Sequence, residues 1–113
     1  RGKVNFNSGD EIGGTGVFDQ GEVSKVIKGR MSALKRCYET SLKSNPTLAG
    51  KVVVEFTIEE RGNVSKARAA DNSTGDAGFA GCIVDTIKRL RWKKGPDGGS
   101  VTFQYPFVFA PQN

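Results

Sequence analysis

Histidine is missing from this 113-residue chain, and cysteine is scarce, with only two residues. Histidine is the side chain that most often serves as a general base near neutral pH, so its absence argues against acid–base catalysis. Two cysteines without histidine do not make a convincing tetrahedral zinc site within one chain. The neighbouring carboxylates Glu59 and Glu60 would point to opposite faces of a strand, so they could not act together on one substrate. We therefore expect no catalytic residues, metal site, cofactor or small-molecule substrate, and we do not expect an enzyme.

Long apolar runs are also missing from the sequence. No stretch approaches the roughly 18 apolar residues of a membrane span, and the first residues lack the apolar centre of a signal peptide. Any export signal or membrane anchor is therefore expected outside this sequence. We expect the protein to contact the membrane only through a helix in that outside part. The composition, with 36% hydrophobic and 26% charged residues, is ordinary for one globular domain.

The N-terminal region is rich in glycine. Residues 1–18 contain five glycines and no helical or alternating pattern, so we expect a flexible linker there. A folded domain is expected over residues 19–110, followed by a tail over residues 111–113. Asp19 can cap a helix with Glu22 three residues later, and Pro46 forces the preceding residue out of helical geometry. The periodicity between them predicts one amphipathic helix over residues 20–44.

The rest of the sequence predicts three strands and a second helix. Residues 52–58 carry apolar side chains at every second position, which is the pattern of a strand with one buried face. Residues 60–63 predict a hairpin turn with a left-handed Gly62, leading to a strand over residues 64–70. A helix capped by Asp76 starts at residue 77 and ends before Gly95 and Pro96. Residues 100–109 alternate again and form the most aromatic strand.

This element order, α-β-β-α-β, limits the topology of the sheet. The helix between the second and third strands carries the chain back, so the third strand runs parallel to the second and can pair antiparallel with the first. The predicted fold class is α+β, with a three-stranded antiparallel sheet of order 2-1-3 and two helices packed on one face. The strand over residues 100–109 is then an edge, which agrees with the presence of Pro106. An edge strand with unpaired backbone groups is either protected or used for binding.

Each of the two cysteines lies beside the apolar stripe of a predicted helix. Because both helices cover the same face of the sheet, Cys37 and Cys82 could face each other. A disulfide between them would close a loop of about 45 residues and stabilise the fold by roughly 4 kcal/mol. The alternative is two buried free thiols, because cysteine packs readily as a small hydrophobic residue.

Basic residues give the chain a net charge of +5 and permit a second class of function. Residues 88–94, KRLRWKK, could bind nucleic acid with Trp92 as a stacking platform. Cations near a helix C-terminus and an indole beside apolar Leu90 also have ordinary structural explanations. Nucleic acid is therefore the less favoured partner.

A set of ordered motifs resembles a known family. The motifs are CYE at residues 37–39, NPTLAG at 45–50, the hairpin GNV at 62–64, the helical Cys82, and YPFVF at 105–109. Together they resemble the TonB-like C-terminal domain of the AgmX/PglI family, found in envelope proteins of myxobacteria, several of them linked to gliding motility. The resemblance covers about residues 21–109.

The resemblance implies a periplasmic protein-interaction domain of an inner-membrane-anchored protein. Such a domain would link an inner-membrane proton-driven motor to an outer-membrane or periplasmic protein segment. It would reach the motor through the part of the protein outside this sequence. Binding would occur by β-strand addition at the last strand. A static cell-envelope anchor remains a further alternative. An oxidising periplasm also favours the disulfide between Cys37 and Cys82. The expected partner-binding residues on the last strand are Ser100, Val101, Thr102, Phe103, Gln104 and Tyr105.

Overall fold

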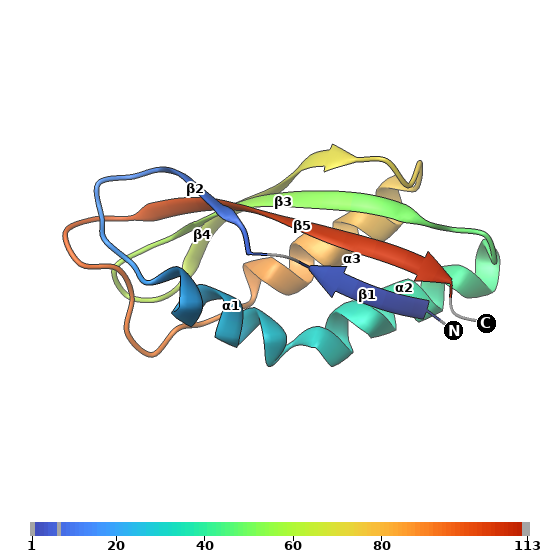
Figure 1. Ribbon diagram of the computed structural model, residues 1–113, viewed down its shortest axis with the longest axis horizontal. Coiled ribbons are helices and arrows are strands. Elements are labelled where there is room, and N and C mark those ends of the chain that lie inside the picture. The colour runs from blue at the N-terminus through green and yellow to red at the C-terminus, as the bar shows by residue number, and fades with distance from the viewer. Residues whose placement is uncertain (1, 7, 112–113) are drawn as a thin grey trace.

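The computed structural model describes residues 2–6 and 8–111 and has an open, five-stranded antiparallel sheet with three helices on one face. Figure 1 shows β5 running through the long axis of the sheet, with the helices below and behind it. The elements are β1 (Gly2–Phe6), β2 (Asp10–Gly13), α1 (Gln20–Lys28), α2 (Met31–Ser44), β3 (Gly50–Ile58), β4 (Val64–Asn72), α3 (Ala77–Lys88) and β5 (Val101–Pro111). The fold is therefore mixed α/β, with a larger sheet and one more helix than the sequence predicted.

The three predicted strands occur with the predicted order and directions. β3 pairs antiparallel with β4 on one side and with β5 on the other, so the order β4-β3-β5 agrees with the prediction. The turn before β4 contains Gly62 at φ 86°, in the left-handed region that glycine favours. Asp76 caps α3 as expected, because its carboxylate accepts a hydrogen bond from the Phe79 backbone N–H at 2.9 Å.

The N-terminal region differs from the linker expected over residues 1–18, because it contains two strands. β1 pairs with the C-terminal half of β5, from Gly2 opposite Pro111 to Phe6 opposite Phe107. β2 pairs with the N-terminal half of β5, from Asp10 opposite Gln104 to Gly13 opposite Thr102. Figure 1 shows β1 along the side of β5 that faces away from β3, while β2 crosses in front of the N-terminal half of β5 in this view. The prediction that the last strand is an edge was therefore wrong, since β1 and β2 pair with its outer side.

The single helix expected over residues 20–44 is also divided in the structure. α1 ends at Lys28 with Gly29 as its C-cap, and the Arg30 backbone N–H donates to the Ile27 carbonyl at 2.9 Å, which is the tighter bonding of a terminal turn. Glycine is a poor helix former, so the chain bends there before α2 begins at Met31. The predicted start is confirmed, because the Asp19 side chain accepts from the Gly21 backbone N–H at 2.9 Å.

The core lies between the helices and one face of the sheet. Val52, Val54 and Phe56 of β3 are fully buried, as are Tyr38 of α2 and Ile83 of α3. Cys37 and Cys82 form a disulfide that joins α2 to α3, with their Cα atoms 5.9 Å apart. The predicted disulfide is therefore present, and it connects two helices on the same side of the sheet.

Candidate partner-binding edge

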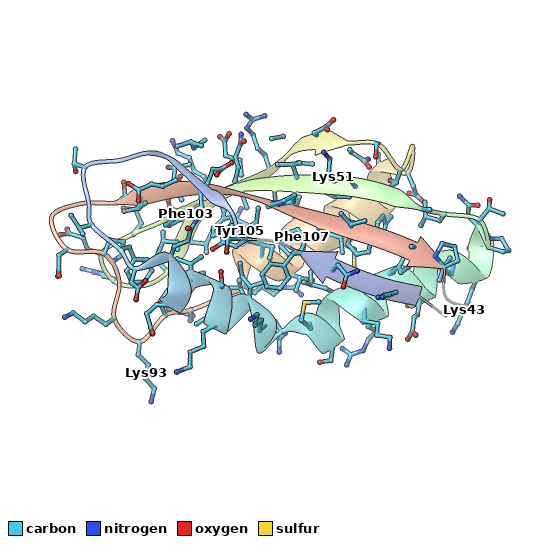
Figure 2. All side chains as sticks on the ribbon, viewed as in Figure 1. Lys43, Lys51, Lys93, Phe103, Tyr105 and Phe107 are labelled. Carbon is cyan, nitrogen blue, oxygen red and sulfur yellow. A yellow bond between two sulfur atoms is a disulfide. The ribbon has the colours of Figure 1, made fainter. Side chains whose placement is uncertain are left out.

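The six residues proposed for partner binding alternate along β5 and the residue before it. Val101, Phe103 and Tyr105 point toward the helices and are fully buried, while Ser100, Thr102 and Gln104 are half-buried. Figure 2 labels Phe103, Tyr105 and Phe107 in sequence along β5. The Tyr105 hydroxyl lies 2.9 Å from Ser24 Oγ of α1, and burial raises the pKa of the phenol. The aromatic side chains are therefore part of the core, and only the backbone and the alternate polar side chains are available to a partner.

The face of the sheet opposite the helices carries a polar network beside this surface. Thr102 Oγ1 lies 2.8 Å from Thr57 Oγ1 on β3. The Gln104 amide donates to Glu55 Oε1 at 2.9 Å, and the Arg68 guanidinium of β4 donates to the same carboxylate at 3.1 and 3.3 Å. These contacts fix the side chains of Thr102 and Gln104 against β3, on the face of the sheet opposite the helices.

The acid dependence of stability should report on this network. Hydrogen bonds from Gln104 and then from Arg68 lower the pKa of Glu55 below its ordinary value of 4.5. A pKa that is lower in the folded than in the unfolded state stabilises the fold at pH values above the unfolded-state pKa. This stabilisation is lost as the pH falls through the folded-state pKa. We expect Glu55→Gln to cost about 0.5 kcal/mol at pH 7 and progressively less below about pH 4.5. Urea unfolding of both proteins at pH 3 and pH 7 measures this, and an equal difference at both values would contradict it.

β2 covers the outer side of β5 at the proposed partner-binding residues. Glu11 lies opposite Phe103, and the register shifts between Glu11 and Gly13. Asp10, Glu11 and Ile12 are all exposed, and Ile12 leaves 48% of its surface to solvent. Gly14 has φ 97°, and a side chain there would collide with the Ser100 carbonyl oxygen. β2 therefore touches β5 through its backbone far more than through its side chains.

β1 is attached to β5 in a different manner, because its side chains join the core. Val4 and Phe6 are half-buried and pack against the core cluster. The Phe6 ring lies 5.6 Å from Phe107 and 6.0 Å from Tyr105, measured between centroids. The sequence contains a signal for this strand that the interpretation as a linker missed. Val4 and Phe6 are separated by polar Asn5, which is the alternation of a short half-buried strand.

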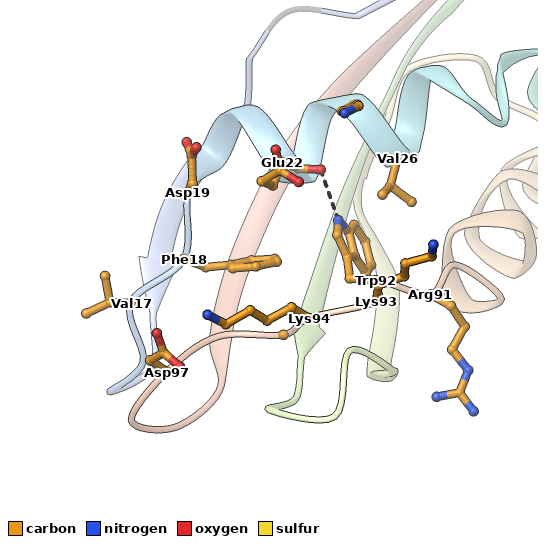
Figure 3. A pocket seen from close by; sticks show the side chains of 12 residues that line it. Val17, Phe18, Asp19, Glu22, Val26, Arg91, Trp92, Lys93, Lys94 and Asp97 are labelled. Carbon is orange, nitrogen blue, oxygen red and sulfur yellow. Dashed lines mark hydrogen bonds between the residues drawn. The ribbon is translucent and has the colours of Figure 1, made fainter.

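An open pocket lies at the other end of the molecule from the β1 pairing. It has a volume of about 740 Å³ and is lined by α1, the segment before it and the segment after α3. Phe18, Val26 and Trp92 provide apolar walls, and Lys93 and Lys94 lie on the segment after α3 (Figure 3). Lys93 extends outward in Figure 2. The pocket is able to accept an apolar side chain, and it is separate from the six proposed residues.

Trp92 is a wall of this pocket but not an exposed stacking platform. Its side chain is only 4% exposed, and its indole N–H donates to the Glu22 carbonyl at 3.1 Å, as the dashed line in Figure 3 marks. Its ring stacks on Phe56 at 6.4 Å and meets Phe18 edge-on at 6.3 Å. The role considered for Trp92 as a nucleic-acid platform is therefore wrong.

Two further kinds of feature are absent from residues 2–6 and 8–111. No helix in these ranges has the length and apolar character needed to cross a membrane. Within the same ranges, no three histidine, cysteine or acidic side chains come close enough to hold a metal ion.

Residues 46–111, more than half of the chain, match the protein family described as Gram-negative bacterial TonB protein C-terminal. The matched segment includes β3, β4, α3 and β5, and β1 and β2 lie before it. No curated protein and no solved structure matches the chain.

Proposed function

Because this chain belongs to the Gram-negative bacterial TonB protein C-terminal family of periplasmic protein-interaction domains, we propose that it binds an extended segment of an envelope protein by β-strand addition to β5. The proposed surface is the outer side of β5 at Ser100, Val101, Thr102, Phe103, Gln104 and Tyr105. The domain acts by binding and not by catalysis.

The pairing of β5 with β1 and β2 supports this proposal more than any other observation. Both short strands pair antiparallel with the side of β5 that faces away from β3, so this side accepts extended backbone. In strand addition, backbone hydrogen bonds supply affinity and alternate side chains supply selectivity. Thr102 and Gln104 lie in the right place for selectivity, because their side chains are on the face opposite the helices.

The wider role follows from the motifs that resemble the AgmX/PglI family. We place the domain in a protein anchored in the inner membrane by a segment outside these 113 residues. The partner is a segment of an outer-membrane or periplasmic protein, and the domain transmits work from a proton-driven motor in gliding-motility-type machinery. The oxidising periplasm suits the disulfide between Cys37 and Cys82.

An NMR titration tests the proposed surface. The ¹⁵N-labelled oxidised domain is titrated with synthetic peptides that cover periplasm-facing segments of outer-membrane proteins from the same bacterium. We expect amide shifts concentrated at residues 100–105, because new backbone hydrogen bonds change the environment of these groups most directly. β4 forms the opposite end of the strand order and serves as an internal control. Shifts confined to β4, or to the basic residues 88–94, would contradict the proposal.

A further inference from the structure

We propose that β2 is a resident occupant of the partner-binding surface, and that the partner binds by replacing it. The inferred partner is an extended segment, antiparallel to β5, with an apolar side chain opposite Phe103 and a basic side chain opposite Gln104. This inference rests on the proposed function, because it specifies the partner of the same side of β5.

β2 occupies part of the surface proposed for the partner. β2 pairs with Thr102, Phe103 and Gln104, which are three of the six residues proposed for the partner. A second strand cannot pair with the same backbone groups at the same time, since each N–H and C=O points to one side of the strand. Binding at these residues therefore requires β2 to leave.

β2 is attached to β5 more weakly than β1 is. Its residues Asp10, Glu11 and Ile12 are exposed, whereas Val4 and Phe6 of β1 pack against the core. Side chains that stay in water contribute little hydrophobic stabilisation. The register shift between Glu11 and Gly13 also interrupts the ladder, as a β-bulge does. β2 is therefore the part of the N-terminal region that is easiest to detach from β5.

Glycines on both sides of β2 allow the chain to bend there. Gly9 precedes the strand, and Gly14 and Gly16 follow it. Glycine has access to more backbone conformations than other residues, so a segment between glycines can change direction at low cost. The chain is held at Gly9 and Gly16 themselves: the Gln20 side chain donates to the Gly9 carbonyl, and the Gly16 N–H donates to the Ser100 carbonyl. β2 is thus a short segment held between two attached points.

The side chains opposite β2 define the chemistry of the partner. Residues directly opposite in an antiparallel pair share a face, so Glu11 lies on the helix-bearing face beside the buried ring of Phe103. An apolar side chain would bury surface there that the Glu11 carboxylate leaves in water.

The charges around Gln104 determine which partner side chain suits the position opposite it. Asp10 lies opposite Gln104, and Gln104 lies opposite Glu55 on the neighbouring strand. Two carboxylates therefore flank Gln104 on the face away from the helices. Arg68 already pairs with Glu55, so a basic side chain in place of Asp10 gains mainly by removing the second carboxylate beside Gln104. A partner with these two features has an advantage over β2 at both positions.

Two designed peptides and four variants of the full chain test the inference. The probe is the peptide of residues 8–17 with Asp10→Lys and Glu11→Val, and the control peptide has the unchanged sequence. Gly14→Ala should release β2, because the new methyl group meets the Ser100 carbonyl and the backbone has φ 97°. Gly13→Ala is its matched control, since a Cβ there only approaches Thr102 at 3.9 Å. Asp10→Cys/Gln104→Cys locks β2 to β5 by a disulfide, and Asp10→Ser/Gln104→Ser is the unlinked control.

We expect the probe to bind Gly14→Ala at least about tenfold more tightly than the wild type and Gly13→Ala, with amide shifts on residues 102–104. The locked variant should show no binding at these residues, while its serine control should bind. The control peptide should bind Gly14→Ala more weakly than the probe. Peptide mapping by mass spectrometry verifies the lock. If Gly14→Ala perturbs the core, a fifth variant, Glu11→Pro, releases β2, because proline is poorly tolerated within a paired strand.

Three outcomes would overturn the inference alone, and a fourth would overturn the proposed function as well. Equal binding of the probe to the wild type, the released variant and the locked variant would show that β2 is not a competing occupant. Equal binding of the two peptides would show that the inferred side-chain pattern is wrong. A released variant that binds outer-membrane peptides at residues 100–105 but not the probe would reject the inferred chemistry and leave the proposed function intact. If the released variant binds no peptide at β5, both proposals fail.

Discussion

Replacing Cys37 and Cys82 together by serine is expected to lower the free energy of unfolding by about 4 kcal/mol in non-reducing buffer. The disulfide joins residues 45 positions apart, so in the unfolded chain it closes a long loop and removes much conformational freedom. The loss is a large part of the roughly 5–15 kcal/mol that stabilises a typical domain. Urea unfolding followed by Trp92 fluorescence measures it directly.

The same experiment in reducing buffer separates the covalent link from the packing of the side chains. The wild type should then become about as unstable as the double-serine variant, because the link is open in both. The serine at position 37 retains a polar neighbour, since Thr86 Oγ1 lies 3.6 Å from the Cys37 sulfur. A difference of similar size with and without reductant would mean that the sulfur atoms stabilise the core by packing alone. Single substitutions are less informative, because Cys82 is exposed and an unpaired thiol there can form intermolecular disulfides.

Local signals in the sequence were sufficient to predict the three central strands. The alternation along β3 identifies its buried face, and Gly62 and Asp76 mark the turn and the cap on either side of β4. The direction of α3 then determines that β5 runs antiparallel to β3. The same layering allowed Cys37 and Cys82 to face each other but left two free thiols as an alternative, and the family resemblance favoured the disulfide that the structure contains.

Local signals did not predict that β1 and β2 cover the outer side of β5, because a glycine-rich segment is compatible with two opposite structures. A glycine-rich segment is flexible in isolation, but glycine also allows a backbone to approach another segment closely. A side chain at Gly2 would collide with the Tyr38 ring, and one at Gly9 would collide with Tyr105. The sequence near Gly2 does not indicate these distant neighbours. The segment was therefore predicted as a linker, and the edge that it covers was predicted as open.

The division of the predicted first helix into α1 and α2 was also not predictable from local sequence signals. The apolar periodicity continues from α1 into α2, since Ile27 and Leu34 are both fully buried. One glycine in a long amphipathic pattern costs only about 1 kcal/mol, so the pattern alone favours an unbroken helix. The bend at Gly29 lets α1 follow the N-terminal half of β5, where Ser24 reaches the Tyr105 hydroxyl. A contact between helix and sheet thus decides a feature that local propensity leaves open.

Truncation of Trp92 to alanine is expected to destabilise the domain by about 3–5 kcal/mol. The indole is 4% exposed, stacks on Phe56 and donates a hydrogen bond to the Glu22 carbonyl, so its removal leaves a cavity and takes away that hydrogen bond. Trp92→Phe retains most of the apolar contact and should cost clearly less than Trp92→Ala. Thermal unfolding followed by far-ultraviolet circular dichroism measures both variants without relying on tryptophan fluorescence.

A nucleic-acid function for residues 88–94 predicts a different result for the same variants. If Trp92 stacked on bases, Trp92→Ala would weaken binding of a single-stranded oligonucleotide while the fold kept its stability. The matched control is Lys93→Gln/Lys94→Gln, which removes two exposed cations beside the indole and leaves the core in place. We expect this control to unfold like the wild type, and neither variant to change oligonucleotide binding at low salt. An unchanged unfolding temperature for Trp92→Ala, together with loss of oligonucleotide binding in both variants, would instead favour the basic surface as the functional site.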